Sequence, residues 1–211
     1  MMYTETTVRE KMEKSNYPQL DEGLDEKVFG YKGIEYSLYE LRNSANNFRT
    51  DDAKCYRNIA KAKYSKIYNC EQDFVPVKLL EEVYGLDETF KEIWREVPDN
   101  KKYTVSNLGR IKLNGILVYQ DDENFNGYLK MTKTTEGKDS DNRSENIYIF
   151  VAKAFFSNYK EGRHVHHINN NGYDCRPENL ILLTPPQHSK VHGFPVKGDD
   201  NSYEKVSQVG Q

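Results

Sequence analysis

Long apolar segments are missing from this sequence. No run approaches the roughly 20 apolar residues that a membrane-spanning helix needs, and the polar start MMYTETTVRE lacks the apolar segment of a signal peptide. The mean hydropathy is low, at −0.89, and 30% of the residues are charged. We therefore expect a cytoplasmic protein with much exposed surface, built from two small domains.

Cysteine is scarce as well. Cys55, Cys70 and Cys175 are odd in number and far apart, and no two of them form a Cys-x-x-Cys pair. A disulfide framework usually has an even number of cysteines, and a zinc knuckle normally uses at least two neighbouring ones. The sequence therefore predicts reduced thiols and indicates neither a disulfide framework nor a cysteine-based zinc knuckle.

The net charge is small, at -3, but it conceals an uneven distribution. Residues 1–88 carry 13 Lys and Arg against 17 Asp and Glu, whereas residues 89–198 carry 16 against 13. Inside the acidic front, the stretch AKCYRNIAKAKYSK contains basic residues and no acidic one. The negative sum argues against a general nucleic-acid coat protein, while this stretch forms a local basic patch.

Residues 1–88 are expected to form a mainly helical N-terminal region. Up to about Gly30 the periodicity is weak, so we expect this part to be partly helical and poorly packed. Residues 37–66 are typical of two short helices, which could form a helix-turn-helix. Its second helix would present Lys54, Arg57 and Lys61 on one face. An ordinary solvent-exposed helix face, with no bound DNA, explains these three basic residues equally well.

Residues 89–198 have a different sequence pattern and form the second expected domain. Apolar and polar residues alternate, and the pairs Asn114-Gly115 and Asn126-Gly127 are strong hairpin signals, which predicts an antiparallel meander. The segment NIYIFVAKAFFSNY, from residue 146, then predicts an apolar strand that runs into a helix.

Further predictions concern the core of this domain and the segments on either side of it. VPVKLLEEVYGL predicts a helix that leads into the domain, and Phe155 and Phe156 are candidates for its core. The polar residues 199–211 predict a flexible tail.

All the histidines lie in one stretch near the C-terminal end. RHVHHI predicts a short strand in which His166 and His167 point to opposite faces. The polar loop NNNGYDCRPEN leads to a second strand, NLILLT. Thr184 and Pro185 then suit the N-cap and first position of a helix. The predicted unit is strand, loop, strand, helix.

This last helix carries His188 and His192 at i and i+4, on one face. With a histidine of the strand they give three imidazoles that could converge on one divalent ion and leave positions open for a phosphate oxygen and water. A neutral His167 could then take a proton from the attacking water. These are the parts of a one-metal phosphodiesterase. A structural zinc site and surface histidines are the alternatives.

The spacing of three of these residues resembles a known motif. His167, Asn179 twelve positions on and His188 nine positions further resemble the HNH (ββα-metal) nuclease motif. Upstream, EIWREVPDNKKYTVSNLGRIKLNG and NGYLKMTK resemble the module that precedes this motif in phage and intron-encoded homing endonucleases. The resemblance covers about residues 90–193. It implies an α+β fold, in which an antiparallel β meander leads into a ββα-metal nuclease core.

The resemblance also implies roles for single residues. By similarity His167 is the general base, His166 and His188 are metal ligands, and Asn179 braces the loop that aims His167. In some relatives a histidine four residues after the last motif position also binds the metal, and His192 matches it. Homing enzymes often have Asp and Asn among their ligands, so this all-imidazole set departs from them. Magnesium or manganese is expected, with zinc or nickel as alternatives.

The function implied is that of a phage-encoded homing endonuclease, acting as a monomer or dimer on double-stranded DNA. The basic residues expected to contact DNA from the second domain are Lys101, Lys102, Arg110, Lys112, Lys130 and Lys133. A non-cleaving DNA-binding protein with a structural metal and a phage packaging or defence nuclease are the alternatives. If residues 37–66 are a DNA-recognition module, deletion of residues 1–88 should leave a soluble nuclease core that still nicks DNA, with lower affinity and relaxed site choice.

Overall fold

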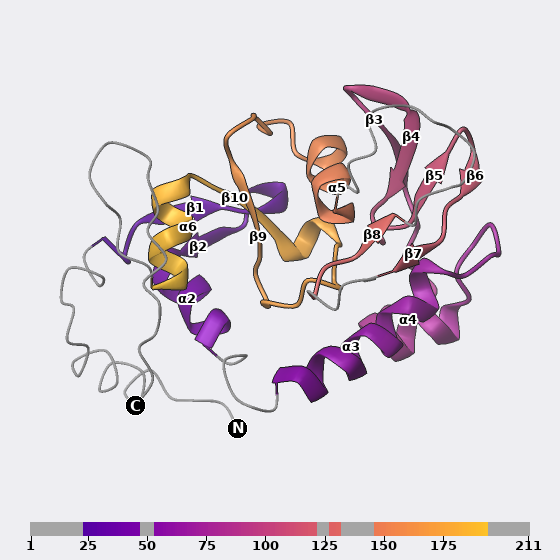
Figure 1. Ribbon diagram of the computed structural model, residues 1–211, viewed down its shortest axis with the longest axis horizontal. Helices are drawn as coiled ribbons and strands as arrows, with labels where there is room; N and C mark the ends of the chain where they lie inside the picture. Colours follow the sequence, from indigo (N-terminus) through magenta and orange to yellow (C-terminus); the bar gives the residue numbers. More distant parts are fainter. Residues whose placement is uncertain (1–22, 47–52, 122–126, 132–145, 194–211) are drawn as a thin grey trace.

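The computed structural model describes residues 23–46, 53–121, 127–131 and 146–193 (Figure 1). Short antiparallel sheets pack against helices, which confirms the predicted α+β class. None of the helices in these ranges is long and apolar enough to cross a membrane. The predicted tail, Lys133 and Asn126 lie outside the described residues.

The N-terminal part begins with a hairpin that the sequence did not predict. Strands β1 (Lys27–Phe29) and β2 (Glu35–Ser37) pair antiparallel and are joined by the short helix η2 (Tyr31–Gly33). Helix α2 (Leu38–Asn46) follows directly. Its start is fixed by a reciprocal cap, because the Glu40 carboxylate accepts from the Ser37 backbone N–H while the Ser37 hydroxyl accepts from the Glu40 N–H.

The expectation of poor packing up to Gly30 is wrong for residues 23–30, the part of that stretch that the structure describes. One buried cluster combines residues from both ends of the chain: Leu24, Val28, Leu38, Leu41, Ile181, Leu183 and Val191. Local periodicity could not reveal this packing, because its partners lie more than a hundred residues away in the sequence.

The two helices predicted within residues 37–66 are present. Buried side chains of α2 pack against α6 (Pro185–His192). Those at the end of α3 (Ala53–Tyr68) pack against the meander and α4 (Val77–Tyr84). A helix-turn-helix needs its two helices to pack on one another, whereas the described side chains of α2 and α3 belong to different clusters. The described side chains therefore do not show the packing of a helix-turn-helix.

The predicted meander is confirmed. Strands β3 (Trp94–Val97), β4 (Asn100–Ser106), β5 (Ile111–Leu113) and β6 (Ile116–Leu117) form one antiparallel sheet in that order. The β5–β6 turn has Asn114 at φ 51° and Gly115 at φ 84°, the left-handed pair that an Asn-Gly hairpin turn requires. Strands β7 (Gln120–Asp121) and β8 (Lys130–Met131) form a second small hairpin.

The apolar strand predicted from residue 146 does not exist as such. Residues Ile147–Phe155 form helix α5 throughout. Buried Ile147, Phe150 and Val151 recur at helical spacing, but the unbroken apolar sequence hides that period. The core positions predicted for Phe155 and Phe156 are confirmed.

The predicted strand–loop–strand–helix unit lies at the centre of the molecule. Strand β9 (His164–His167) pairs antiparallel with β10 (Leu180–Leu183), and the short helix η3 (Pro177–Asn179) and α6 flank β10. Leu180 and Leu182 join the core that α5 and the meander form, whereas Ile181 and Leu183 join the N-terminal cluster. Figure 1 shows β9 and β10 between these two parts. The hairpin therefore has a core on each face.

Candidate active site

Helix α6 is held in place by strong end signals. The Thr184 hydroxyl accepts from the Gln187 backbone N–H at 3.3 Å, and the Gln187 side chain accepts from the Thr184 N–H at 2.7 Å. Pro185 occupies the first turn, and Gly193 ends the helix at φ 68°. The predicted N-cap is thus confirmed. The cap fixes the residue at which α6 begins, and therefore which of its side chains face β9.

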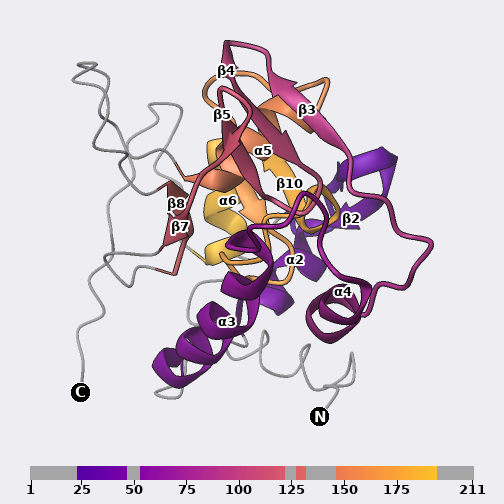
Figure 2. The same ribbon diagram turned by 90° about the vertical axis from the view of Figure 1, so that its right-hand side faces the viewer.

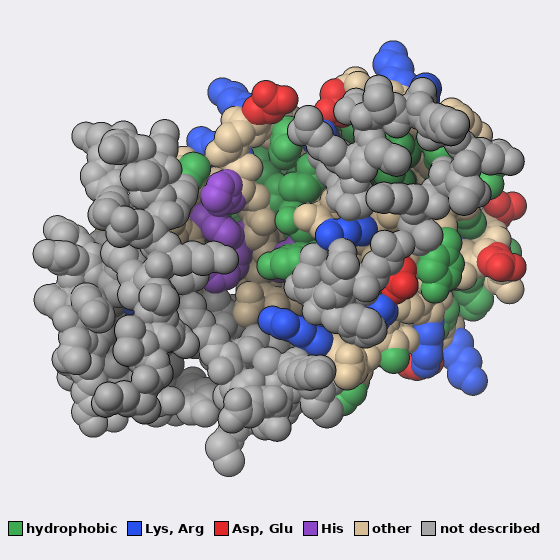
Figure 3. All heavy atoms as spheres, viewed as in Figure 1, with side chains coloured by type: hydrophobic (Ala, Val, Ile, Leu, Met, Phe, Trp, Pro, Cys, Tyr) green, Lys and Arg blue, Asp and Glu red, His purple; other side chains and the backbone are tan. Residues whose placement is uncertain are grey.

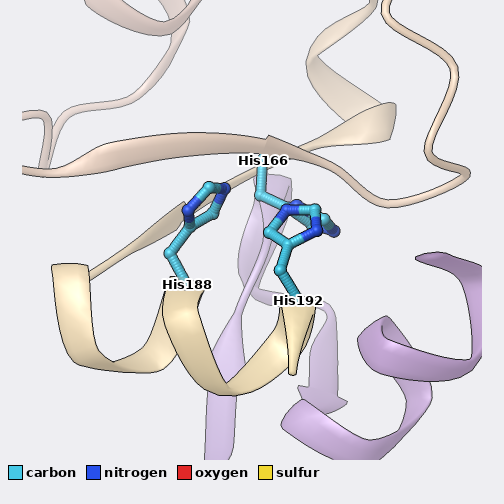
Figure 4. A group of neighbouring side chains, drawn as sticks. All are labelled: His166, His188 and His192. Atoms are coloured by element: carbon cyan, nitrogen blue, oxygen red, sulfur yellow. The ribbon is translucent and has the colours of Figure 1, made fainter. Parts of the chain in front are cut away.

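Three histidines meet between α6 and β9. His188 and His192 project from one face of the helix toward the strand that carries His166, as Figure 4 shows. Their candidate ligand nitrogens all lie within 4.8 Å of one another. The ring centroids are 5.5 Å apart for His166 and His188 and 4.5 Å apart for His188 and His192. The structure therefore brings together all three of the predicted metal ligands.

Burial keeps two of these imidazoles, His166 and His188, neutral. It lowers the pKa of His166 to about 2, with the neighbouring His192 and His188 adding to the effect. Burial, followed by His192 and His164, lowers the pKa of His188 to about 3. His166 is only 3% exposed, and its Nε2 has no hydrogen-bond partner among the described residues. Three imidazoles whose nitrogens converge, one of them with an unpartnered buried nitrogen, fit a divalent cation.

A fourth histidine belongs to this cluster, and the sequence interpretation missed it. His164 Nδ1 lies 3.2 Å from His188 Nδ1, so that one of the two nitrogens donates and the other accepts. This contact leaves Nε2 of His188 as its remaining ligand atom. The missed signal is the strand period of two, which puts His164 and His166 on the same face of β9.

His167 occupies the opposite face of β9. Its ring packs edge-on against Tyr148 at 4.9 Å between centroids and lies 5.8 Å from the ring of Tyr128. The side chain is 5% exposed, and its Nε2 has no hydrogen-bond partner among the described residues. Burial lowers its pKa to about 4, against an opposing effect of Asp174. At neutral pH this imidazole is an unprotonated base.

Asn179 fastens the loop that follows His167. Its side-chain oxygen accepts from the Asn169 backbone N–H at 3.0 Å. Its amide nitrogen donates to the Asn169 side chain and to the Asp174 carbonyl, both at 2.8 Å. Its own carbonyl accepts from the Ile168 N–H at 2.8 Å. Asn179 thus ties both sides of the loop to the end of β9, beside His167.

Comparison with known proteins fits this geometry. Residues 149–190 match the HNH endonuclease family. The chain contains an HNH endonuclease domain. The match runs from α5 through β9 and β10 into α6, and it includes His166, His167, Asn179 and His188. Endonucleases are hydrolases that cleave phosphodiester bonds within a nucleic acid, and HNH nucleases generally use a divalent metal ion.

One solved structure, described as "DNA binding and cleavage by the HNH homing endonuclease I-HmuI", is similar to part of this chain. The similarity covers 46% of this chain and 56% of that one, with 23% sequence identity and a TM-score of 0.40. This chain therefore spans about half the length of that protein. No curated protein sequence matches the chain.

The histidines reach the surface on one side of the molecule. Figure 3 shows histidine side chains on this face, next to hydrophobic ones, with Lys and Arg side chains nearby. Of the basic residues predicted on the meander, Lys101 and Lys102 are exposed on β4. Lys112 lies over the ring of Trp94 at 4.3 Å, and Lys130 is half-buried.

Arg110 is a correction, because it cannot contact a ligand at the surface. Its side chain is 0% exposed and forms an ion pair with Glu92 at 2.8 Å. It also donates to the backbone carbonyls of Cys70 and Gln72, at 2.9 and 2.6 Å. Arg110 therefore ties the meander to the loop after α3.

The predicted basic stripe of α3 is used partly for packing. Arg57 and Lys61 are spaced so that they share a helix face with Tyr64 and Tyr68, which turn inward. Lys61 forms an ion pair with Asp121 at 2.8 Å. Arg57 is exposed and lies beside Gly127, since a Cβ there would be 3.6 Å from its Nε. The side chain of Lys54 lies outside the described part of α3.

Proposed function

We propose that this protein is a metal-dependent DNA endonuclease. The observation that carries the proposal is the pairing of two features across β9 within an HNH domain. One is the group formed by His166, His188 and His192, and the other is the buried, unprotonated His167. A structural metal site needs no such base, so this pairing argues for cleavage.

His166, His188 and His192 would hold one divalent ion. When bound, the ion supplies a positive charge that stabilises the phosphate and the leaving oxygen. Three imidazoles suit manganese, zinc or nickel better than magnesium, which prefers oxygen ligands. The contact between His164 and His188 orients the His188 ring, in the way that a hydrogen bond on the second imidazole nitrogen usually does.

His167 would accept the proton of the attacking water at Nε2. Its pKa of about 4 keeps that nitrogen free of a proton at neutral pH, because burial disfavours the charged form. Tyr148 and Tyr128 hold the ring on two sides, and Asn179 holds the backbone that follows. The residues thus have separate tasks: Asn179 positions His167, and His167 takes the proton.

For the DNA contacts, the exposed basic residues Lys101, Lys102 and Arg57 are the best candidates, and Lys112 and Lys130 are half-exposed. We extend the proposal to a homing endonuclease because two sequence segments before the HNH motif resemble homing enzymes. Such an enzyme cuts at few, long sites, whereas a packaging or defence nuclease with the same chemistry cuts at many. Mapping the cut positions on a long DNA separates these roles.

Cleavage of supercoiled plasmid tests the proposal. We expect the full-length protein to convert it to open-circular or linear DNA with Mn²⁺ or Mg²⁺, and excess chelator to stop the reaction. Agarose gel electrophoresis measures the products over time. If the folded protein leaves plasmid intact with Mg²⁺, Mn²⁺, Zn²⁺ and Ni²⁺ alike, it is not a DNA endonuclease.

Calorimetric metal titration tests the ligand set. Replacing His188 or His192 by Ala should weaken Mn²⁺ binding, because each removes one of three nitrogen donors. His164→Ala is the matched comparison, since it removes the contact to His188 but none of the three proposed ligands, and it should cost about 10–100-fold in affinity. We expect a larger loss for His188→Ala than for His164→Ala. Unchanged affinity in His188→Ala would remove it from the ligand set.

A further inference from the structure

Three tyrosines from outside the HNH match face the loop between β9 and β10. Tyr64 and Tyr68 come from α3 and Tyr84 comes from α4, and we call them the tyrosine cluster. The rings of Tyr64 and Tyr84 pack edge-on at 5.4 Å. Figures 1 and 2 both show α3 and α4 side by side. The proposed chemistry gives these residues no task.

Tyr68 holds the backbone of the loop. Its hydroxyl donates to the Tyr173 carbonyl and accepts from the Cys175 N–H, the latter at 3.2 Å. Tyr68 is buried, as are both loop residues. Buried backbone groups that lose their partner carry a desolvation cost, so one hydroxyl satisfies a donor and an acceptor of the loop at once.

Tyr84 holds a charged side chain of the same loop. The guanidinium of Arg176 lies over its ring, 4.0 Å from the centroid. Arg176 in turn donates from two nitrogens to the two carboxylate oxygens of Asp174, at 2.9 and 2.8 Å. Asp174 is only 1% exposed. A carboxylate so deeply buried needs a well-placed cation, and the ring of Tyr84 fixes where that cation lies.

From Asp174 the contacts lead to the catalytic base. The second carboxylate oxygen of Asp174 accepts from the Asn169 side chain at 3.2 Å, and the Asp174 carbonyl accepts from Asn179 at 2.8 Å. Asn169 and Asn179 close the loop two residues after His167. Every step is a hydrogen bond, an ion pair or a ring contact between described residues.

We propose that Tyr68 and Tyr84 are positioning residues for the reaction of the HNH domain. Tyr68 acts on the loop backbone at Tyr173 and Cys175, whereas Tyr84 acts through Arg176 and Asp174. Both hold the loop that orients His167. The inference rests on the proposed function, since His167 is the proposed base. Helices α3 and α4 are then part of the catalytic unit, although the HNH match begins only at residue 149.

The contacts distinguish positioning from simple core packing by chemical group. Tyr68 acts through its hydroxyl, whereas Tyr84 acts through its ring. Among the described residues, the Tyr84 hydroxyl makes only long contacts, 3.4 Å to the Tyr68 hydroxyl and 3.5 Å to the Leu108 carbonyl. Removing a hydroxyl should therefore matter at Tyr68 and not at Tyr84. If the tyrosines only filled space, both Tyr→Phe changes would be nearly silent.

The experiment compares four full-length variants: Tyr68→Phe, Tyr84→Phe, Tyr84→Ala and Tyr103→Ala. Tyr103 is the matched control for Tyr84, because both side chains are half-buried. The ring of Tyr103 packs on Phe150, with 5.1 Å between the ring centroids, and so lies among core residues rather than against the loop. Plasmid cleavage gives kcat and KM, and thermal unfolding gives Tm. Hydrogen exchange follows the loop amides of Asn169, Asn171 and Tyr173, which donate within the loop.

We expect Tyr68→Phe and Tyr84→Ala to lower kcat by about 10–100-fold with KM nearly unchanged, because a slightly misplaced base slows the chemical step. The loop amides should exchange faster in both. Tyr84→Phe should behave as wild type, and Tyr103→Ala should lower Tm without changing kcat or loop exchange.

Two results would overturn the inference. One is a kcat loss in Tyr84→Ala no greater than in Tyr103→Ala at similar Tm, and the other is unchanged loop exchange in Tyr68→Phe and Tyr84→Ala. If the wild type cuts no DNA, the proposed function fails, and the exchange comparison still decides whether the tyrosines hold the loop.

Discussion

His167→Ala should lower the rate of DNA cleavage by about 10²–10⁴-fold, the usual effect of losing a general base. Metal affinity should stay close to that of the wild type. The reason is the alternation of β9, which points His167 away from the face that carries His166. The base and the candidate ligands therefore lie on opposite faces of one strand, and a change to one leaves the other in place.

Single-turnover cleavage of plasmid, with a calorimetric metal titration, measures both expectations. Because His167 is buried against Tyr148 and Tyr128, the variant leaves a small cavity, so Tm must be compared first. Added imidazole is the matched control, since it can occupy that cavity and restore part of the rate. Cleavage within a few-fold of wild type, without imidazole, would mean that the base is another residue.

Local signals in the sequence predicted the elements that carry the candidate site. Thr184 and Pro185 set the start of α6, which brought His188 and His192 onto one face. The adjacent His166 and His167 implied opposite faces of a strand, and the register of β9 and β10 has this arrangement. Caps, turns and strand alternation involve neighbours within a few residues, so the sequence reports them directly.

Long-range contacts were beyond such reasoning. Arg110 sits among alternating residues that predict an exposed strand, but its partner Glu92 and two carbonyls after α3 draw it into the interior. The apolar start of α5 was misread as a strand because it is covered on several sides, which erases the helical period. The role of the tyrosine cluster could not be predicted from the sequence either, because Tyr84 and Arg176 are far apart in the chain and come into contact only in the folded protein.

One overlooked signal concerns the whole architecture. The strand Leu180–Leu183 is apolar at every position, and all four side chains are buried. A strand with one buried face would alternate with polar residues, so an unbroken apolar run indicates a core on both faces. The second core is the cluster in which residues before position 88 pack against Ile181, Leu183 and Val191. The domain boundary predicted from composition had placed the residues before position 88 outside the nuclease domain.

Deleting residues 1–88 should therefore unfold the nuclease rather than free it. The deletion removes Leu24, Val28, Leu38 and Leu41 from their cluster with Ile181, Leu183 and Val191, and it takes Tyr68 from the other core. Burying a side chain of this size contributes about 1.5–3 kcal/mol. Four such losses compare with a typical total stability of about 5–15 kcal/mol. This expectation reverses the one drawn from the sequence.

Point variants test the same argument without a large deletion. Leu41→Ala should lower the free energy of unfolding by about 2–5 kcal/mol, because Leu41 is fully buried in the N-terminal cluster. Ile34→Ala is the matched control: this residue of the same hairpin region is 49% exposed and should change stability by no more than about 0.5 kcal/mol. Urea unfolding measures both, and circular dichroism reports whether residues 89–211 fold alone. A fragment that unfolds cooperatively and cuts DNA like the full chain would show that the N-terminal region is a separate module, and the shared core on β10 would then add nothing to the stability of the HNH domain.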